Sequence, residues 1–130
     1  MKYLILLLLL LSTTGYANSK KVIETIVYEA SGEKLGGQLA VARVIRNRAR
    51  ERGLTFTEVV EQPYQFSCWN TDKHRSYNDK EFKRAINAWI KSKDYKLDAN
   101  LYHSTKVKPY WINKVNRIKQ IGNHIFYKED

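Results

Sequence analysis

Glu29 is the residue of this chain whose type and position best suit acid catalysis. It sits beside an apolar stripe at helical spacing, formed by Val22, Ile23, Ile26, Val27 and Ala30. At about 100° per residue Glu29 falls just beyond the edge of that stripe, so its carboxyl group should be half buried. Ser31 and Gly32 then end the helix, and a carboxyl group at such a break can face a cleft. Burial disfavours the charged form and raises the pKa, which a general acid near neutral pH requires.

Two other interpretations of this stretch stay open. A glutamate near a helix C-terminus is often a solvated surface residue without a chemical role. Glu33 competes for the role of the acid, although it lies past the break and beside Lys34, where we expect a solvated turn. Glu29 is therefore the first candidate for the catalytic acid and Glu33 the second.

An irregular segment between Gln62 and Lys80 carries a second group of candidates. The apolar residues of this segment follow neither a helical nor a strand spacing, and aromatic residues are mixed with amide and hydroxyl residues. Aromatic rings stack on the apolar faces of sugars, while polar groups pair with their hydroxyl and acetamido groups. The segment therefore suits a sugar-binding surface. A purely structural role is the alternative, and we expect Phe66 to pin the loop to the core.

Four helices and a small sheet should position these residues. Helices are expected from Lys20 to Ala30, from Gly37 to Arg50 with Gly53 as its end, from a Thr55–Glu58 capping box to Pro63, and from an Asn78 cap towards Ser92. The run Leu101–His103 is strand-like. Two further runs, 115–121 and 124–127, flank Gly122-Asn123, which is typical of a tight hairpin. The pattern predicts an α+β domain, mostly helical, with a small antiparallel sheet at its C-terminal end.

The composition fits one exported domain. A chain of 130 residues with 43% hydrophobic content can form one core, hardly two. Residues 1–17 carry a basic residue, an apolar run from Tyr3 to Leu11 and the small residues Gly15 and Ala17, which is typical of a signal peptide cut after Ala17. The run is too short to span a bilayer as a helix, so we expect no membrane span after cleavage. The remaining domain comprises residues 18–130. We expect it in the periplasm, the cell envelope or the extracellular space.

The net charge, the cysteine and the histidines limit which binding partners and cofactors the chain can have. The net charge of +10 becomes +9 once Lys2 is removed with the signal peptide, which suits an anionic polymer, but the basic residues are spread and no specific nucleic-acid motif emerges. Cys68 is the single cysteine, which excludes an internal disulfide, and we treat this residue as a buried small hydrophobe. We expect the domain to be a monomer. His74, His103 and His124 lack a recognised ligand spacing, so neither a metal nor a cofactor is predicted.

The assembled segments resemble the SleB/CwlJ family of cell wall hydrolases, whose catalytic domains cleave the glycan strands of peptidoglycan. The resemblance is carried, in order, by Tyr28–Glu33, Gly37–Ala42 leading into Val44–Arg48, Gln65–Cys68 and Ile121–Tyr127. It covers nearly all of the chain after the signal peptide. The usual arginine of the first motif is replaced here by Ser31, which puts the substrate preference in doubt, and the stretch 69–78 is local to this chain.

The resemblance implies a lysozyme-like fold and a function. The first glutamate of the family motif, its catalytic acid, falls on Glu29. Candidates for lining the sugar groove are Gln65, Ser67, Trp69, Tyr102, His103 and Trp111. The implied reaction is that of a lytic transglycosylase acting between N-acetylmuramic acid and N-acetylglucosamine. Hydrolysis, with Glu33 as a second carboxylate, and a secreted glycan-binding module without activity stay open as alternatives.

Overall fold

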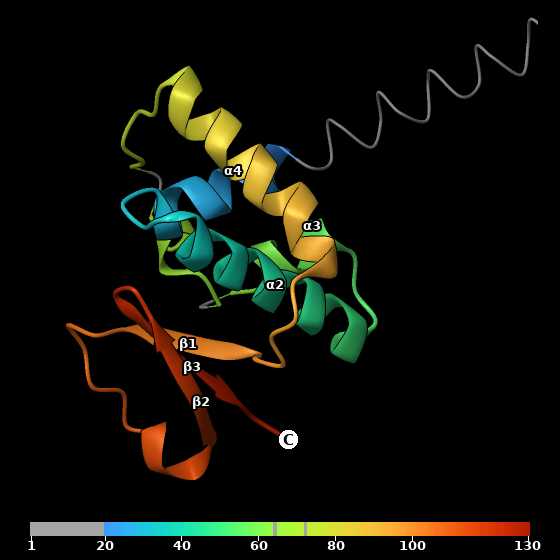
Figure 1. Cartoon of the computed structure of the whole chain (residues 1–130), viewed down its shortest axis with the longest axis vertical. Coiled ribbons are helices and arrows are strands. Elements are labelled where there is room, and N and C mark those ends of the chain that lie inside the picture. Colours follow the sequence, from blue (N-terminus) through green and yellow to red (C-terminus); the bar gives the residue numbers. More distant parts are fainter. Residues whose placement is uncertain (1–19, 64, 72) are drawn as a thin grey trace, which may run out of the picture.

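The computed structural model describes residues 20–63, 65–71 and 73–130. The predicted signal peptide, residues 1–17, lies outside the described residues. Figure 1 shows the helices gathered in one part of the molecule and three strands at the opposite end, where the C-terminus lies. The predicted α+β fold, mostly helical with a small antiparallel sheet, is confirmed. No helix among the described residues combines the length and the apolar character needed to cross a membrane.

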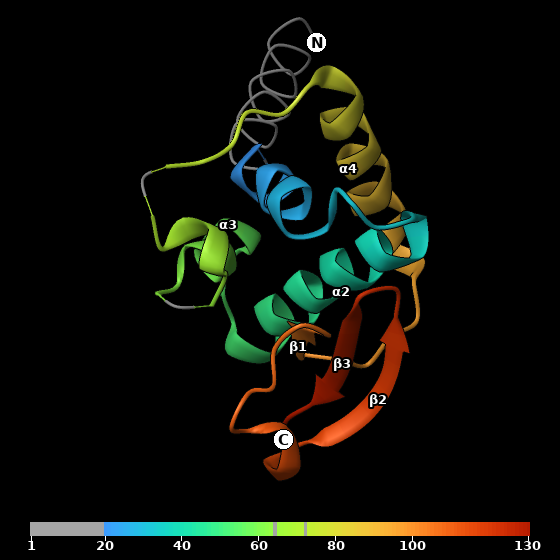
Figure 2. The same ribbon diagram turned by 90° about the vertical axis from the view of Figure 1, so that its left-hand side faces the viewer.

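The helices follow the predicted order. A first helix covers residues 20–30, and α2 (Leu35–Arg52), α3 (Phe56–Glu61) and α4 (Asp79–Lys91) follow it. Short 3₁₀ helices cover Ser67–Trp69, Ser92–Asp94 and Ile112–Lys114. In both views α2 lies between the other helices and the sheet (Figures 1 and 2). It begins before and ends after the predicted bounds, because Lys34 serves as its N-cap and Gly53 as its C-cap.

The helix ends are fixed by the residues that the sequence singled out. Gly53 adopts φ 64°, the left-handed conformation that closes α2. In the predicted capping box of α3, the Glu58 N–H donates to Thr55 Oγ1 at 3.1 Å and the Thr55 N–H donates to Glu58 Oε1 at 3.0 Å. Asn78 Oδ1 accepts the Glu81 N–H at 2.9 Å and caps α4.

The sheet consists of β1 (Leu101–Ser104), β2 (Asn116–Ile121) and β3 (His124–Lys128) in the order β1-β3-β2, with both pairs antiparallel. Gly122, at φ 58°, forms the predicted tight turn between β2 and β3. His124 begins the central strand and pairs with Ser104 on one side and Ile121 on the other. The turn and the first residue of β3 are thereby held at a defined place beside the helices.

Two hydrophobic clusters share α2. One cluster joins Ala42, Ile45 and Ala49 of α2 to the helix of residues 20–30, to α3 and to α4. Phe66 belongs to it and is 2% exposed, so the predicted anchoring of the loop by this residue is confirmed. The second cluster lies between an adjoining face of α2 and the sheet, and its α2 members are Ala40, Val41 and Val44. Because α2 contributes residues to both clusters, it is the helix that joins the helical part of the domain to the sheet.

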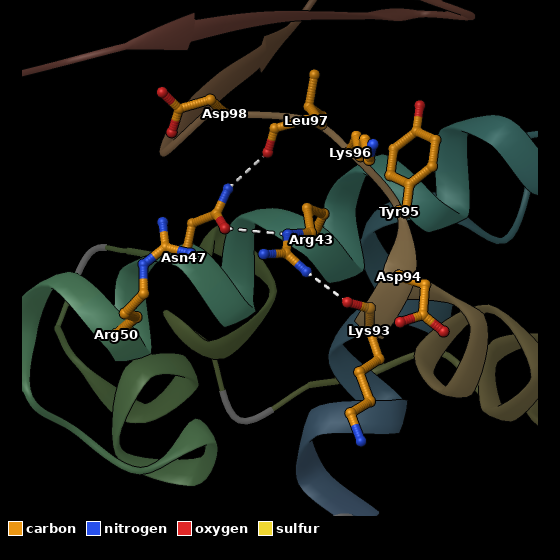
Figure 3. A pocket seen from close by; sticks show the side chains of 9 residues that line it. All are labelled: Arg43, Asn47, Arg50, Lys93, Asp94, Tyr95, Lys96, Leu97 and Asp98. Carbon is orange, nitrogen blue, oxygen red and sulfur yellow. Dashed lines mark hydrogen bonds between the residues drawn. The ribbon is translucent and has the colours of Figure 1, made fainter.

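Polar side chains of α2 also bind the segment that connects α4 to the sheet, beside an open hollow of about 670 Å³ (Figure 3). Asn47 Nδ2 donates to the carbonyl oxygens of Leu97 and Ala99, each at 2.8 Å. Arg43 donates to the Lys93 carbonyl at 2.8 Å and to Asn47 Oδ1 at 3.1 Å. These side chains donate hydrogen bonds to main-chain carbonyls that have no partner within the connecting segment itself. We therefore assign the residues that line this hollow a structural role.

Candidate active site

A cleft of about 390 Å³ opens where the helices meet the sheet, and Glu29 lies in its wall. The residues around it come from distant parts of the chain: the end of the first described helix, α2, the loop before the first 3₁₀ helix, β1 with the loop after it, and the start of β3. Its lining residues are Glu29, Arg48, Gln65, Ser67, Tyr102, His103, Ser104, Val107 and His124. The cleft therefore exists only in the folded domain, since no single element carries it.

Glu29 is half buried, as its position beside the apolar stripe predicted. Burial raises the pKa of its carboxyl group and is the strongest influence on it. The Tyr102 hydroxyl and the Cys68 thiol each donate a hydrogen bond to the carboxylate, and the nearby charge of Arg48 adds to their effect; all three lower the pKa. The effect of burial outweighs the three opposing influences, so the pKa of the carboxyl group is raised overall.

Tyr102 stays protonated and serves as a permanent donor to Glu29. Burial raises the pKa of its hydroxyl well above the ordinary value, and the Glu29 charge raises it further. The Tyr102 ring stands edge-on to His124, with the ring centroids 5.2 Å apart, and also contacts Phe126 of the core. The orientation of this donor therefore depends on the start of β3.

Arg48 places a positive charge beneath the cleft. Its Nε donates to the Asn100 carbonyl at 2.7 Å, and its guanidinium lies 5.0 Å from the centroid of the Phe66 ring. One terminal nitrogen, Nη1, is buried and has no hydrogen-bond partner among the described residues. Burial lowers the pKa of Arg48 to about 10, so the side chain remains charged at neutral pH beside Glu29 and Tyr102.

Cys68 is not the fully buried small hydrophobe that we expected. It is half buried, and its thiol donates to Glu29 from the first 3₁₀ helix. Burial, with the Glu29 charge as the second cause, raises the pKa of this thiol to about 12. The thiol therefore stays protonated at neutral pH and acts as a hydrogen-bond donor.

Four of the six predicted groove residues line the cleft with Glu29: Gln65, Ser67, Tyr102 and His103. Each ring nitrogen of His103 has a partner, since Nδ1 lies 2.7 Å from the Ser104 carbonyl oxygen and Nε2 lies 2.8 Å from the Tyr127 hydroxyl. His103 is thus held rigidly against β3. In the described part of the chain, no three His, Cys, Asp or Glu side chains are grouped so that they could hold a metal ion.

Trp69 and Trp111 do not line the cleft, contrary to our expectation. Trp69 stands edge-on to Tyr28 at 5.6 Å and donates its indole N–H to Thr25 Oγ1 at 2.8 Å, so it fastens the loop to the first described helix. Trp111 packs against His103 and lines a separate hollow of about 350 Å³ near the end of the sheet. Both indole rings are engaged in packing, which sequence spacing alone does not reveal.

The expectation that Glu33 lies in a solvated turn is wrong. This residue is 8% exposed, and its Oε1 accepts the Asn123 N–H at 3.0 Å. The same oxygen lies 3.2 Å from His124 Nδ1. Glu33 lines a neighbouring hollow formed by the start of α2 and the β2–β3 turn, not the cleft of Glu29. The physical reason is the hairpin turn, which covers Glu33 although it lies 90 residues further along the chain.

Sequence reasoning missed Arg48 and His124 as cleft residues. A usable indication existed for Arg48, because Val41, Val44, Ile45 and Arg48 share one helical stripe and a charge on an apolar stripe is unusual. His124 had no comparable indication, since its place in the cleft depends on the pairing of β3 with β1.

Three comparisons with known proteins bear on this site. Residues 32–127 match the family model described as cell wall hydrolase, a range that begins just after Glu29 and includes Glu33. The catalytic domain of the germination-specific lytic transglycosylase SleB from Bacillus anthracis is 30% identical, with a TM-score of 0.66 over 85% of this chain and 94% of that chain. The catalytic domain of the Bacillus cereus SleB protein is 28% identical, with a TM-score of 0.65 over 86% of this chain and 91% of that one. The comparison with curated proteins yields no match.

Proposed function

Because this chain belongs to the cell wall hydrolase family, we propose that it cleaves the glycan strands of peptidoglycan between N-acetylmuramic acid and N-acetylglucosamine, with Glu29 as its single catalytic carboxyl group. The observation that carries the proposal is the half-buried Glu29 in a polar cleft, with a raised pKa and two neutral hydrogen-bond donors. Peptidoglycan lies outside the cytoplasmic membrane, so the proposal includes export of the chain.

The reaction begins with protonated Glu29. Its proton passes to the glycosidic oxygen as the bond from that oxygen to C1 of the muramic acid breaks, which leaves positive charge at C1. The C6 hydroxyl of the same sugar then attacks C1 and gives its proton to the Glu29 carboxylate. The product is a 1,6-anhydro sugar, no water is consumed, and Glu29 ends the cycle protonated as it began it.

The surroundings of Glu29 suit both halves of this cycle. Burial favours the protonated form that the first half requires. After proton transfer, the Tyr102 hydroxyl, the Cys68 thiol and the Arg48 charge stabilise the carboxylate. These groups are in place before the reaction, so they need little rearrangement in the transition state.

Gln65 and Ser67 supply polar groups along the cleft beside Glu29, while His103, whose ring nitrogens are both engaged within the protein, adds its ring to the wall. Amide and hydroxyl groups of this kind pair with sugar hydroxyl and acetamido groups, and they can set the position of the scissile bond over Glu29. We assign to them the binding of the two sugars that flank that bond.

Hydrolysis would call for a second carboxylate about 5 to 9.5 Å from the first, depending on the stereochemical course. Among the described residues that line the cleft, Glu29 is the one carboxylate. Glu33, the second candidate, binds the hairpin turn and lies in the neighbouring hollow. These positions favour the anhydro product over the hydrolytic one.

The test is mass spectrometry of purified peptidoglycan after digestion by the wild-type protein, by Glu29→Gln and by Glu61→Gln. Glu61 is a suitable control because it is an exposed carboxylate paired with Lys21 at 3.5 Å. We expect anhydro-muropeptides from the wild type and from Glu61→Gln, and none from Glu29→Gln. Reducing ends without the anhydro sugar would instead indicate hydrolysis, and no product from any variant would leave a glycan-binding module.

A further inference from the structure

Glu33 is a buried carboxylate that the proposed reaction does not use. Burying a charged group is costly unless partners compensate it, so its surroundings require an explanation. Its side chain accepts the Asn123 N–H and approaches His124 Nδ1, while its own carbonyl oxygen accepts a hydrogen bond from Arg84 of α4 at 2.9 Å. The residue therefore contacts both the hairpin turn and the helical part of the molecule.

Two glycines enclose the Glu33 side chain. A Cβ atom on Gly37, in the first turn of α2, would lie 2.8 Å from Glu33 Cβ. A Cβ atom on Gly122, in the β2–β3 turn, would overlap Glu33 Oε2. Because both positions lack a side chain, the carboxylate fits between the helix and the turn with little freedom to move.

His124 connects this buried carboxylate to the cleft. It is 8% exposed, lines the cleft of Glu29, and its buried Nδ1 has no aligned hydrogen-bond partner among the described residues, although Glu33 Oε1 lies 3.2 Å away. Its ring meets the Tyr102 ring edge-on, at an interplanar angle of 87°. Tyr102 in turn donates to Glu29. An unbroken series of contacts thus joins the two glutamates.

We propose that Glu33 is a positioning residue that holds the His124 ring, and that His124 in turn keeps the Tyr102 hydroxyl directed at Glu29. The proposal rests on the proposed function of Glu29 as the acid. A carboxylate near Nδ1 favours the imidazole form that carries a proton on this nitrogen, because only that form can donate to Glu33. Glu33 thereby selects both the place and the tautomer of the histidine.

The charges around His124 agree with a neutral ring. Burial lowers its pKa and is the strongest influence; the Glu33 charge raises the pKa and His103 lowers it. The ring is therefore uncharged at neutral pH and acts through its close approach to Glu33 and its packing against Tyr102. Removing the Glu33 charge should lower the His124 pKa further, which provides a direct readout of this contact.

The first experiment compares Glu33→Gln with Glu61→Gln as the matched exposed control. Glutamine keeps the size of the side chain and an oxygen for the Asn123 N–H, so the hairpin contact is retained while the charge is lost. In Glu33→Gln we expect kcat on peptidoglycan to fall about tenfold with KM nearly unchanged, because a misdirected donor weakens catalysis rather than binding. Glu61→Gln should match the wild type.

A substrate-free readout separates this proposal from the reaction itself. The Tyr102 hydrogen bond lowers the Glu29 pKa, so a misdirected Tyr102 should raise that pKa, whereas the loss of a nearby negative charge would by itself lower it. In Glu33→Gln the Glu29 pKa, followed by NMR of the labelled side-chain carboxyl carbon, should therefore rise and the His124 pKa should fall. This titration tests the positioning role even if the product analysis contradicts the proposed reaction.

A double-mutant cycle tests whether Glu33 acts through His124. His124→Leu leaves Glu33 in place and should raise the Glu29 pKa as Glu33→Gln does, and adding Glu33→Gln to it should have little further effect. An unchanged Glu29 pKa in both single variants, or fully additive losses of kcat, would overturn the proposal. If Glu33→Gln fails to fold, the His124→Leu titration still decides the link between His124 and Glu29.

Discussion

Glu29 and Glu33 are close in sequence, yet Glu29 is half buried beside a cleft whereas Glu33 is buried, and the two side chains have different partners. Glu29 faces a cleft and accepts hydrogen bonds from the neutral donors Tyr102 and Cys68. Glu33 lies between two glycines, where it accepts a main-chain N–H and contacts His124. One carboxyl group lines an open cleft, while the other is enclosed between a helix and a turn.

The difference arises from a helix end. In a continuous helix, residues at positions i and i+4 lie on the same face, so both glutamates would share a surface. Here the helix ends at Ala30, and the Glu33 N–H donates to the Ala30 carbonyl at 3.0 Å within a turn. The turn redirects Glu33 towards the hairpin. A short break in regular structure is enough to give two identical side chains different surroundings.

The largest expected effect is the loss of activity when Glu29 is replaced. Glu29→Gln should reduce turnover of peptidoglycan about 10²- to 10⁴-fold, since a general acid contributes by that order, while binding is retained. Initial rates of solubilisation and sedimentation with insoluble peptidoglycan measure the two quantities. A larger loss in Glu33→Gln than in Glu29→Gln would reverse the assignment of the two carboxyl groups.

The next largest effect is a loss of stability when a side chain is added at Gly122, which lies against Glu33. Gly122→Ala should destabilise the domain by about 2–4 kcal/mol, because it combines left-handed strain with a clash against Glu33 Oε2. Gly53→Ala is a matched control with a similar φ of 64° and no atom near its added Cβ, so it should cost only about 1 kcal/mol. Urea unfolding of both variants measures the difference, and equal losses would show that the Glu33 contact is unimportant.

A smaller effect concerns the dependence of stability on pH. The Glu29 pKa is higher in the folded protein than its ordinary value of 4.5, so folding favours the protonated form. This stabilisation is complete below pH 4.5 and is lost as the pH rises through the folded-state pKa. Glu29→Gln lacks this dependence, so its melting temperature relative to that of the wild type should be higher at pH 7 than at pH 4. Thermal scans of both proteins at the two values check this, and a difference independent of pH would contradict it.

The smallest effect concerns the second donor to Glu29. Cys68→Ala removes the thiol hydrogen bond and should reduce kcat about threefold, the range expected for one neutral hydrogen bond. Cys68→Ser keeps a donor and should recover most of the activity. Rates of the two variants, measured side by side, test the assignment, and equal activity in both would mean that the thiol fills space without affecting Glu29.

The parts of the fold that were predicted correctly depend on local interactions. The caps at Thr55 and Asn78 and the turn at Gly122 are decided by residues a few positions apart, and the half burial of Glu29 follows from the period of a single helix. Such features are visible in the sequence because their causes lie next to them.

The parts that were missed depend on distant partners. Glu33 is buried by a turn at the far end of the chain, and Trp69 is held by Thr25 of the first described helix. Arg48 becomes a cleft residue because Asn100, 52 residues later, fixes its Nε. A local pattern set Arg48 apart as a charge on an apolar stripe, but no local pattern identifies the partners of these residues, since the contacts form only when distant segments pack together.

The hydrogen bonds of the Asn47 amide affect how the domain folds and unfolds. It holds the carbonyls of Leu97 and Ala99 across 50 and 52 residues of chain, so the helices and the sheet cannot separate without breaking both of these buried hydrogen bonds. The two halves should therefore unfold in one cooperative transition, with no stable state in which the helices persist alone. A cleft assembled from both halves is then either complete or absent, and partly folded chains carry no activity.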